Sequence, residues 1–141
     1  MNDLVTIEMT ATQAVDGQKD VSTVIYEGRC NITDDVAILR YAAKDENGNI
    51  ITKIELHEDG CILENTGDIR RRMEFIPGKR TVSKMQLPMG CLEMIVDTHT
   101  YDLQVIKEEP KCMKIILEYA LYTGDALMTE NKLEIKVGVR Q

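Results

Sequence analysis

The chain has 141 residues, of which 43% are hydrophobic and 29% charged, and its net charge is −7. This length predicts one domain that can bury a core. The acidic balance argues against a nucleic acid as the main partner, because binding the phosphate backbone needs a dominant positive field. The longest apolar runs are far shorter than the roughly 20 residues that a membrane-spanning helix needs, so no membrane partner is expected.

The N-terminal residues, MNDLVTIEMT, contain no basic segment followed by an apolar run. We therefore expect no signal peptide, and the predicted location is the cytoplasm. In that reducing compartment Cys30, Cys61, Cys91 and Cys112 are expected to be free thiols rather than disulfides. They form no C-x-x-C pair, so the sequence predicts neither a metal site nor a cofactor.

Alternation of apolar and polar residues is the dominant pattern along the chain, and it predicts strands. The first strand is predicted over 5–11, where Val5, Ile7, Met9 and Ala11 share one face. Further strands are predicted over 21–30, 36–43, 50–57, 61–64, 91–98, 101–106, 113–121 and 132–140, the last ending at Arg140. The predicted turns between them are Asp16-Gly17, Asp34-Asp35, Asn47-Gly48, Glu58-Asp59-Gly60 and Thr123-Gly124-Asp125, with a charged loop at 107–111.

Roughly ten short strands without a long helix predict an all-β fold, either a barrel or a sandwich. An even meander can close on itself, which removes the exposed strand edges that invite aggregation. We therefore expect residues 1–141 to form a single closed, antiparallel up-and-down barrel of about ten strands.

The central stretch, residues 66–98, carries the only local surplus of positive charge: six basic residues lie between Ile69 and Met85 against one acid, Glu74. Residues 69–76 fit either a short helix or a strand. A helix would begin at Asp68. A strand would turn Arg71 to the same side as Ile69. The segment is short and its neighbours are strands, so we favour the strand.

A wider pattern of turns and apolar positions resembles a known family. It comprises Thr66-Gly67, Met73-Glu74-Phe75-Ile76-Pro77-Gly78, Leu87-Pro88-Met89-Gly90 and Thr98, followed by a late apolar strand with Tyr119. This order resembles the YwiB-like family of small bacterial proteins with a calycin (lipocalin-like) barrel. The resemblance implies an up-and-down barrel and brings no established biochemical activity with it. Around the Pro-x-Gly step the family pattern has a threonine and an aromatic residue, where this chain has Leu87 and Met89.

The basic residues of the central stretch are the first candidates for a binding site. They are Arg70, Arg71, Arg72, Lys79, Arg80 and Lys84. Planar guanidinium groups match the oxygens of a carboxylate or phosphate, so a small anionic ligand is a candidate partner. The alternative is a solvated outer face whose basic groups pair with the many acids of neighbouring strands.

Arg71 differs from its neighbours because the strand alternation places it with apolar residues. If it points inward, it needs a partner, since an unpaired buried charge is very costly; its alternative is to reach solvent along its aliphatic stem. Tyr26, Tyr41, Tyr119 and Thr98 are candidates for placing hydroxyl groups inside the barrel. Of these, Tyr119 and Thr98 join the arginines in the predicted ligand site.

Signals for catalysis are weak. His57 and His99 are the only histidines, and neither lies in an H-E-x-x-H or G-x-S-x-G context. Ser22 and Ser83, the only serines, have no nucleophile context either. An enzyme is therefore the third choice. The leading hypothesis is a non-enzymatic binding module for a small, anionic ligand.

The second hypothesis is a protein-interaction scaffold, in the form of a homodimer. Ile116, Ala120 and Tyr122 lie on the face opposite the apolar residues of 113–121, yet they are uncharged. An outer apolar sheet face of this kind would suit contact with a second copy.

Overall fold

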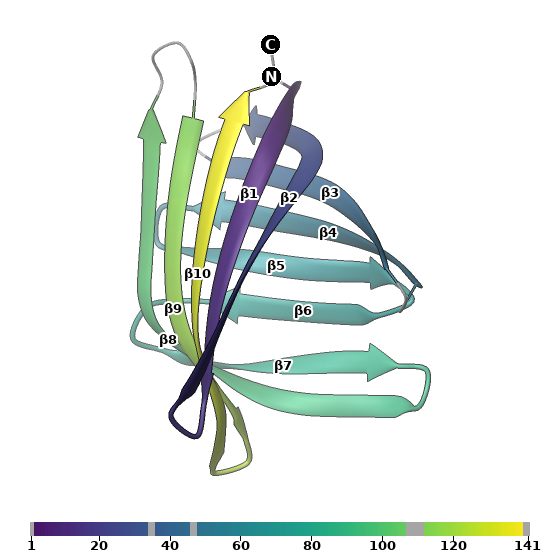
Figure 1. Cartoon of the computed structure of the whole chain (residues 1–141), viewed down its shortest axis with the longest axis vertical. Coiled ribbons are helices and arrows are strands. Elements are labelled where there is room, and N and C mark those ends of the chain that lie inside the picture. Colours follow the sequence, from purple (N-terminus) through teal and green to yellow (C-terminus); the bar gives the residue numbers. More distant parts are fainter. Residues whose placement is uncertain (1, 34–35, 46–47, 107–111, 140–141) are drawn as a thin grey trace.

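The computed structural model of the chain describes residues 2–33, 36–45, 48–106 and 112–139. Ten strands make up the fold. They are β1 (Asn2–Val15), β2 (Gln18–Thr33), β3 (Val36–Asp45), β4 (Gly48–His57), β5 (Gly60–Gly67), β6 (Arg70–Phe75), β7 (Arg80–Leu87), β8 (Gly90–Ile106), β9 (Cys112–Thr123) and β10 (Ala126–Val139). Each strand pairs antiparallel with the next, and β1 pairs with β10, so the sheet closes (Figure 1). The predicted all-β, closed antiparallel barrel is confirmed.

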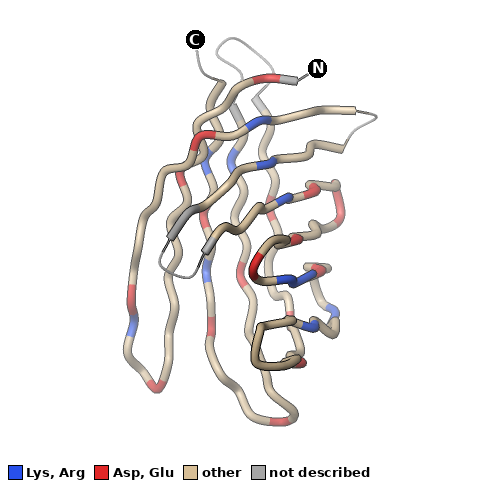
Figure 2. The backbone as a smooth tube through the Cα atoms, turned by 90° about the vertical axis from the view of Figure 1, so that its right-hand side faces the viewer, with Lys and Arg blue, Asp and Glu red and all other residues tan. Residues whose placement is uncertain are grey.

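The barrel is built from two crossing layers. In Figure 1, β9, β10, β1 and the second half of β8 run along the long axis, and β3 to β7 run across it. Because neighbouring strands alternate in direction, the hairpins β1–β2, β3–β4, β5–β6, β7–β8 and β9–β10 turn at one end, here called the hairpin end. The start of β1, the end of β10 and the described β4–β5 and β6–β7 connections lie at the opposite end, the terminal end. Figure 2 shows acidic and basic positions spread over both layers.

The sequence-predicted elements are found with two adjustments. The strands predicted over 91–98 and 101–106 form one long strand, β8, whose pairing with β9 shifts register between Thr98 and Thr100. An irregularity of this kind bends a strand without ending it. In the sequence, the polar run around His99 interrupts the alternation, so the one strand was predicted as two. Residues 69–76, which fitted a helix or a strand, contain β6. The predicted turn residues 34–35 and 47, the loop 107–111 and Arg140 lie outside the described residues.

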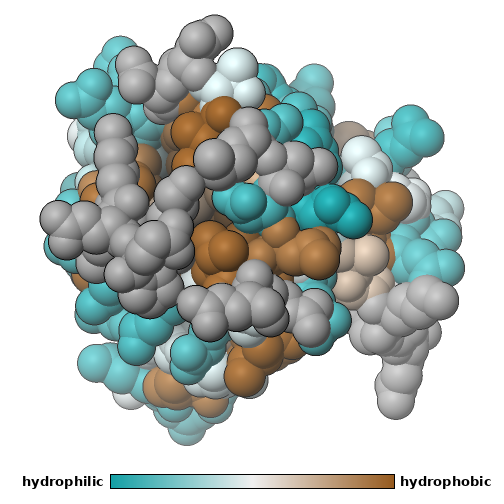
Figure 3. All heavy atoms as spheres, turned by 90° about the horizontal axis from the view of Figure 1, so that it is seen from above, coloured by the Kyte–Doolittle hydropathy of each residue, from teal (hydrophilic) through white to brown (hydrophobic). Residues whose placement is uncertain are grey.

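Apolar side chains fill the barrel from the terminal end to its middle. One cross-strand row runs through Ala37, Leu56, Cys61 and Phe75, none more than 7% exposed. Their burial is the main driving force for closure. Seen from the terminal end, apolar side chains gather at the centre of the molecule (Figure 3).

Two seams of the barrel are short. β2 pairs with β3 only from Gly28 to Thr33. β6 pairs with β7 only at Arg70 and Arg71. Beyond those two positions, side chains replace backbone donors: the Ser83 hydroxyl donates to the Arg72 carbonyl at 2.9 Å, and Thr81 bridges the strands in the same way. The β2–β3 seam therefore opens toward the hairpin end, and the β6–β7 seam opens toward the terminal end.

The cysteines of the described residues are free thiols: Cys30 and Cys61 are buried and Cys91 is exposed. Burial raises the pKa of the Cys61 thiol to about 12, which keeps it protonated and unreactive. The side chain of Cys112 is outside the described set. In the part of the chain that the structure describes, no helix is long and apolar enough to cross a membrane.

Candidate functional site

A row of inward-facing polar residues crosses four neighbouring strands near the hairpin end. Its members are direct cross-strand partners: Tyr41 on β3, Thr52 on β4, Asn65 on β5 and Arg71 on β6. Because successive side chains of a strand point to opposite faces, this register turns all four toward the barrel interior. We call these four residues the polar row.

The Arg71 guanidinium is held by a neutral amide. The Asn65 side-chain oxygen accepts hydrogen bonds from Arg71 Nε at 3.2 Å and Nη2 at 3.0 Å, and the Asn65 amide nitrogen donates to Thr52 Oγ1 at 3.0 Å. This amide orientation satisfies Thr52, Asn65 and Arg71 together. In the reverse orientation the Thr52 hydroxyl donates to the Asn65 oxygen at 3.0 Å, but the Asn65 amide nitrogen then faces the N–H donors of Arg71. Asn65 therefore binds one edge of the planar Arg71 guanidinium, and the N–H donors on the other edge are available to a further acceptor.

Arg71 differs sharply from the next arginine. It is half-buried, and no carboxylate among the described residues lies within ion-pair distance of it. Burial lowers the pKa of Arg71, against the opposing influence of Tyr119 and Tyr41. Arg72 points outward and pairs with Glu64 at 3.5 Å and Glu74 at 2.8 Å. Of these two arginines, the inward one lacks an acidic partner among the described residues.

Two tyrosines complete the surroundings of Arg71. Burial raises the pKa of Tyr41 to about 12, although a hydrogen bond with Thr52 and the Arg71 charge oppose this shift. Burial also raises the pKa of Tyr119, again opposed by the charge of Arg71. The Tyr119 ring packs against Phe75, with centroids 4.8 Å apart. Both phenols are therefore neutral near pH 7. The Tyr41 hydroxyl donates a weak hydrogen bond to Met9 Sδ at 3.9 Å.

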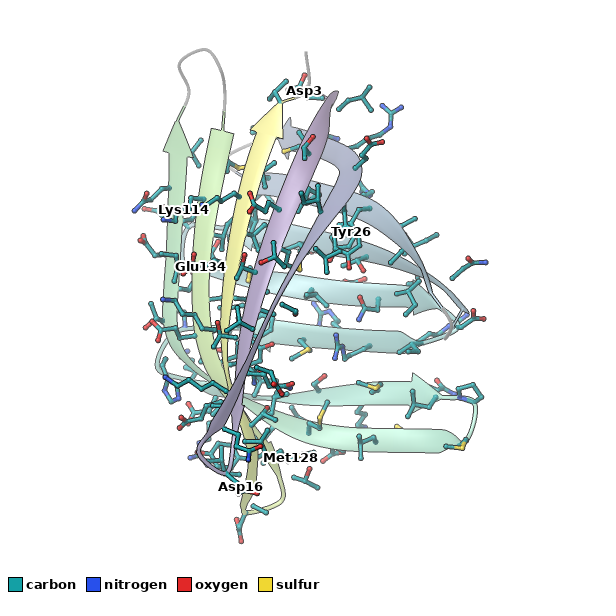
Figure 4. All side chains as sticks on the ribbon, in the orientation of Figure 1. Asp3, Asp16, Tyr26, Lys114, Met128 and Glu134 are labelled. Carbon is teal, nitrogen blue, oxygen red and sulfur yellow. The ribbon has the colours of Figure 1, made fainter. Side chains whose placement is uncertain are left out.

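A glycine makes room for this arrangement. Tyr41 stacks on Tyr26 at 4.4 Å between ring centroids, and Figure 4 places Tyr26 between β2 and the crossing strands. Gly28 on β2 is the cross-strand partner of Tyr41 on β3. A Cβ atom at Gly28 would lie 2.4 Å from the Arg40 carbonyl oxygen and 3.1 Å from Tyr41 Cβ. Only glycine therefore fits there without moving the tyrosine.

Most of the predicted basic cluster lies on the outer surface. Arg70, Arg72, Arg80 and Lys84 are exposed and alternate with inward residues. Arg80 pairs with Asp97 at 3.4 Å and lies over the Tyr122 ring at 4.9 Å. The structure therefore separates Arg71 from the other four basic residues of the predicted site.

The two other predicted site residues face inward. Thr98 is 1% exposed, and its hydroxyl has no hydrogen-bond partner among the described residues. Its backbone bonds instead to the β6–β7 turn, where Gly78 N donates to the Thr98 carbonyl at 2.9 Å. Thr98 is also the cross-strand partner of Tyr119. Arg71, Tyr119 and Thr98 are thus the interior members of the predicted site.

The residues predicted for an interface are only partly available. Ala120 is 1% exposed within the single chain, so it offers almost no surface to another molecule. Ile116 and Tyr122 are half-buried, and the Arg80 guanidinium covers the Tyr122 ring. These three residues do not form an open apolar face.

Sequence reasoning missed Thr52 and Asn65. Each interrupts an otherwise apolar face: Thr52 lies in phase with Ile54 and Leu56, and Asn65 with Leu63. A polar residue in an inward phase was the available signal. The register that brings both residues beside Arg71 is a property of the closed sheet, and no local pattern contains it.

One histidine and one serine make structural contacts. The His57 carbonyl accepts a hydrogen bond from the Tyr101 hydroxyl at 2.6 Å, which ties the β4–β5 turn to β8. Ser83 is buried and bonded to the β6 backbone. Among the described residues, no three His, Cys, Asp or Glu side chains gather closely enough to hold a metal ion.

A separate depression of about 440 Å³ lies on the outer face of β1, β10, β9 and β8. Lys114 and Lys136 line it as direct cross-strand partners, and Glu8 lies opposite Lys136. Figure 4 shows Lys114 on this side of the molecule. Opposite charges share this open surface, so its two lysines are partly compensated by Glu8.

Comparison with known proteins places this barrel in a family. The model of a domain of unknown function, DUF1934, matches residues 7–135. The chain belongs to the DUF1934 family. This chain is similar to the uncharacterized β-barrel protein YwiB of Bacillus subtilis (strain 168). The two are 22% identical over 121 residues, which cover 86% of this chain and 83% of YwiB.

The crystal structure of the B. subtilis ywiB protein has the same fold. It superposes with a TM-score of 0.87 at 18% identity, covering 99% of this chain and 94% of that one. The resemblance to the YwiB-like family is therefore confirmed, as is the barrel. Neither comparison assigns the DUF1934 barrel an activity, and its calycin-like character stays a prediction.

Proposed function

We propose that this protein is a non-enzymatic binding module for a small monoanion with an apolar body. The ligand's charged group binds Arg71 inside the hairpin end of the barrel. The observation that carries the proposal is the half-buried Arg71 guanidinium with a neutral amide on one edge and no carboxylate beside it in the described chain.

The cost of burying a charge supports an anionic ligand. A half-buried guanidinium is stabilised when a carboxylate or phosphate accepts its free N–H donors. Asn65 already satisfies Nε and Nη2, and the neutral phenols of Tyr41 and Tyr119 add donors for the same anion. One unpaired cation among neutral partners favours a single negative charge over a multiply charged group.

The neighbouring residues support an apolar body on that ligand. The cross-strand row that contains Arg71 continues through Met85 on β7 and Leu92 on β8. Leu92 faces inward yet is 39% exposed, and Val24 on β2 is 45% exposed. Covering these side chains with an apolar ligand would remove them from water, which contributes about 25 cal/mol per Å².

The chemistry of the row supports binding rather than turnover. Burial raises the pKa of Tyr41 and Tyr119, which moves both phenols further from the near-neutral range that acid–base catalysis requires. A guanidinium holds its proton as well. The buried free thiols of Cys30 and Cys61 agree with a reducing compartment, so we propose the cytoplasm as the location.

A thermal-shift series with defined probes tests this proposal. The probes are hexanoate, hexylammonium, which reverses the charge, and inorganic phosphate, which lacks an apolar body. We expect hexanoate to raise the melting temperature by several degrees at saturation, and the other two probes to leave it unchanged.

The arginine pair provides the matched control. Arg71→Met should abolish the hexanoate shift, whereas Arg72→Met, which removes the outward neighbour, should retain it. The comparison uses the shift of each variant against its own ligand-free sample, because removing a buried charge can itself change stability. No hexanoate shift in the wild type, or an equal shift in Arg71→Met, would contradict the proposal.

A further inference from the structure

The inward rows on the two sides of the polar row differ in burial. Toward the terminal end, two residues away on each strand, the next inward row is Leu39, Ile54, Leu63 and Met73. Leu39, Ile54 and Met73 are buried, and Leu63 packs against the same core. Because a packed interior has few voids larger than a water molecule, a ligand held by Arg71 is blocked on this side.

The row on the other side is apolar and only half-buried. Toward the hairpin end, the inward positions are Ala43 on β3, Ile50 on β4 and Gly67 on β5, which are successive cross-strand partners. Leu87, two residues beyond Met85 on β7, shares their side of the sheet. Ala43, Ile50 and Leu87 are half-buried, and Gly67 has no side chain. We call Ala43, Ile50, Gly67 and Leu87 the rim row.

The rim row lies close to the hairpin turns. β5 ends at Gly67 and β7 ends at Leu87, and Figure 1 shows both strands turning at the right of the molecule. Two residues of a strand span about 7 Å, which is the depth of apolar wall between the polar row and the rim. An extended chain advances about 1.2 Å per bond. About six bonds therefore reach from an anionic group at Arg71 to the rim.

We propose, resting on the function proposed above, that the Arg71 site takes a medium-chain carboxylate of about six to eight carbons. The chain runs from Arg71 past the rim row and ends at the edge of the barrel. A shorter chain leaves part of the rim row in water, and the last carbons of a longer chain project into solvent. Each CH₂ group that the rim row buries strengthens binding about fourfold, whereas a carbon beyond the rim adds little.

Isothermal titration calorimetry with butanoate, hexanoate, octanoate and decanoate tests this length, with butanoate measured by its competition with octanoate. We expect Kd to fall about fourfold for each CH₂ added between butanoate and octanoate, and to change no more than about twofold from octanoate to decanoate. A full gain for every CH₂ up to decanoate, or equal Kd values for butanoate and octanoate, would overturn the length and leave carboxylate binding intact. Failure of all four to bind would overturn this proposal and the proposed function together.

Two adjacent alanines of β3 provide matched variants for the path of the chain. Ala43→Leu adds a side chain to the inward rim row, whereas Ala42→Leu adds the same side chain to the exposed outer face. We expect Ala43→Leu to weaken octanoate about tenfold and butanoate less, and Ala42→Leu to bind both like the wild type.

The ratio of the octanoate and butanoate Kd values is compared within each variant, so a change in stability alone does not alter the result. If Ala43→Leu does not fold by circular dichroism, Leu87→Ala replaces it. That variant removes apolar contact from the rim row, so it should also weaken octanoate more than butanoate. An unchanged ratio in the folded rim variant, or the same change in Ala42→Leu, would overturn the proposed path.

Discussion

The two ends of the barrel follow the same alternation of side chains and differ in what that alternation encloses. At the terminal end the inward row is Ala37, Leu56, Cys61 and Phe75, all buried. At the hairpin end the polar row takes the corresponding inward positions, four residues away on each strand. The terminal end supplies the apolar burial that closes the sheet, which leaves the hairpin end free to keep polar groups and unpaired edges.

The strand pairing explains part of the same difference. Toward the hairpin end, β2 separates from β3 beyond Gly28, and β8 pairs with β9 only from Ile95 on. Where strands separate, inward side chains such as Val24 and Leu92 remain partly exposed. The predictions below test this division of the barrel.

The largest effect is expected in the packed row. Phe75→Ala should lower the free energy of unfolding by about 3–5 kcal/mol, because it leaves a cavity where the ring now packs. Leu92→Ala at the hairpin end should cost about 1 kcal/mol or less, since that side chain already contacts water. Urea titrations of both variants measure the difference. Equal losses would show that the two ends contribute alike to closure.

Alkaline pH should weaken the fold through its buried phenol and thiol. Burial raises the pKa of Tyr41 from 10.0 to about 12 and that of Cys61 from 9.0 to about 12. Each group therefore contributes stability that is complete below its unfolded pKa and is lost as the pH rises to its folded pKa, at most about 3 kcal/mol for Tyr41 and about 4 kcal/mol for Cys61. Unfolding free energy should be level below pH 9 and should fall toward pH 12.

Tyr41→Phe isolates the phenol in that experiment. This variant should lose less stability than the wild type between pH 10 and 12. The same slope in both proteins would mean that Tyr41 does not titrate in this range.

A methyl group at Gly28 tests how tightly the site is built. Gly28→Ala should cost about 1–3 kcal/mol, because the new Cβ overlaps the Arg40 carbonyl and displaces Tyr41. Near-ultraviolet circular dichroism should report the lost Tyr26–Tyr41 stacking. Gly138→Ala is the control: its Cβ would meet no heavy atom within 4 Å, so its effect should be small.

The smallest effect concerns the unpartnered hydroxyl of Thr98. Thr98→Val should stabilise the ligand-free protein by about 1 kcal/mol, because it removes a buried polar group that lacks a partner. Thr52→Val should instead destabilise it by about 1 kcal/mol, because it leaves the Asn65 amide without its partner. Thermal and urea unfolding separate the two signs. Destabilisation by Thr98→Val would indicate that this hydroxyl has a hydrogen-bond partner.

The candidate site was predictable only in part. The alternation around Arg71 indicated an inward arginine as one of two alternatives, and Tyr119 and Thr98 followed from their apolar neighbours. The other four basic residues carried the same charge signal and lie outside, since a count of charges does not distinguish the faces of a strand. Thr52 and Asn65 were missed because a single threonine or asparagine in a strand is not a motif.

The alternation of side chains and the turn residues by themselves determined that this chain forms antiparallel strands, because both depend on neighbouring residues alone. The order of the hairpins also made closure predictable, since an even meander can join its first strand to its last. Only the tertiary structure decided the cross-strand register, which gathers four polar residues from β3 to β6 into one row. It alone also decided where β2 leaves β3, because the separation depends on how the two layers cross and on the packing between them.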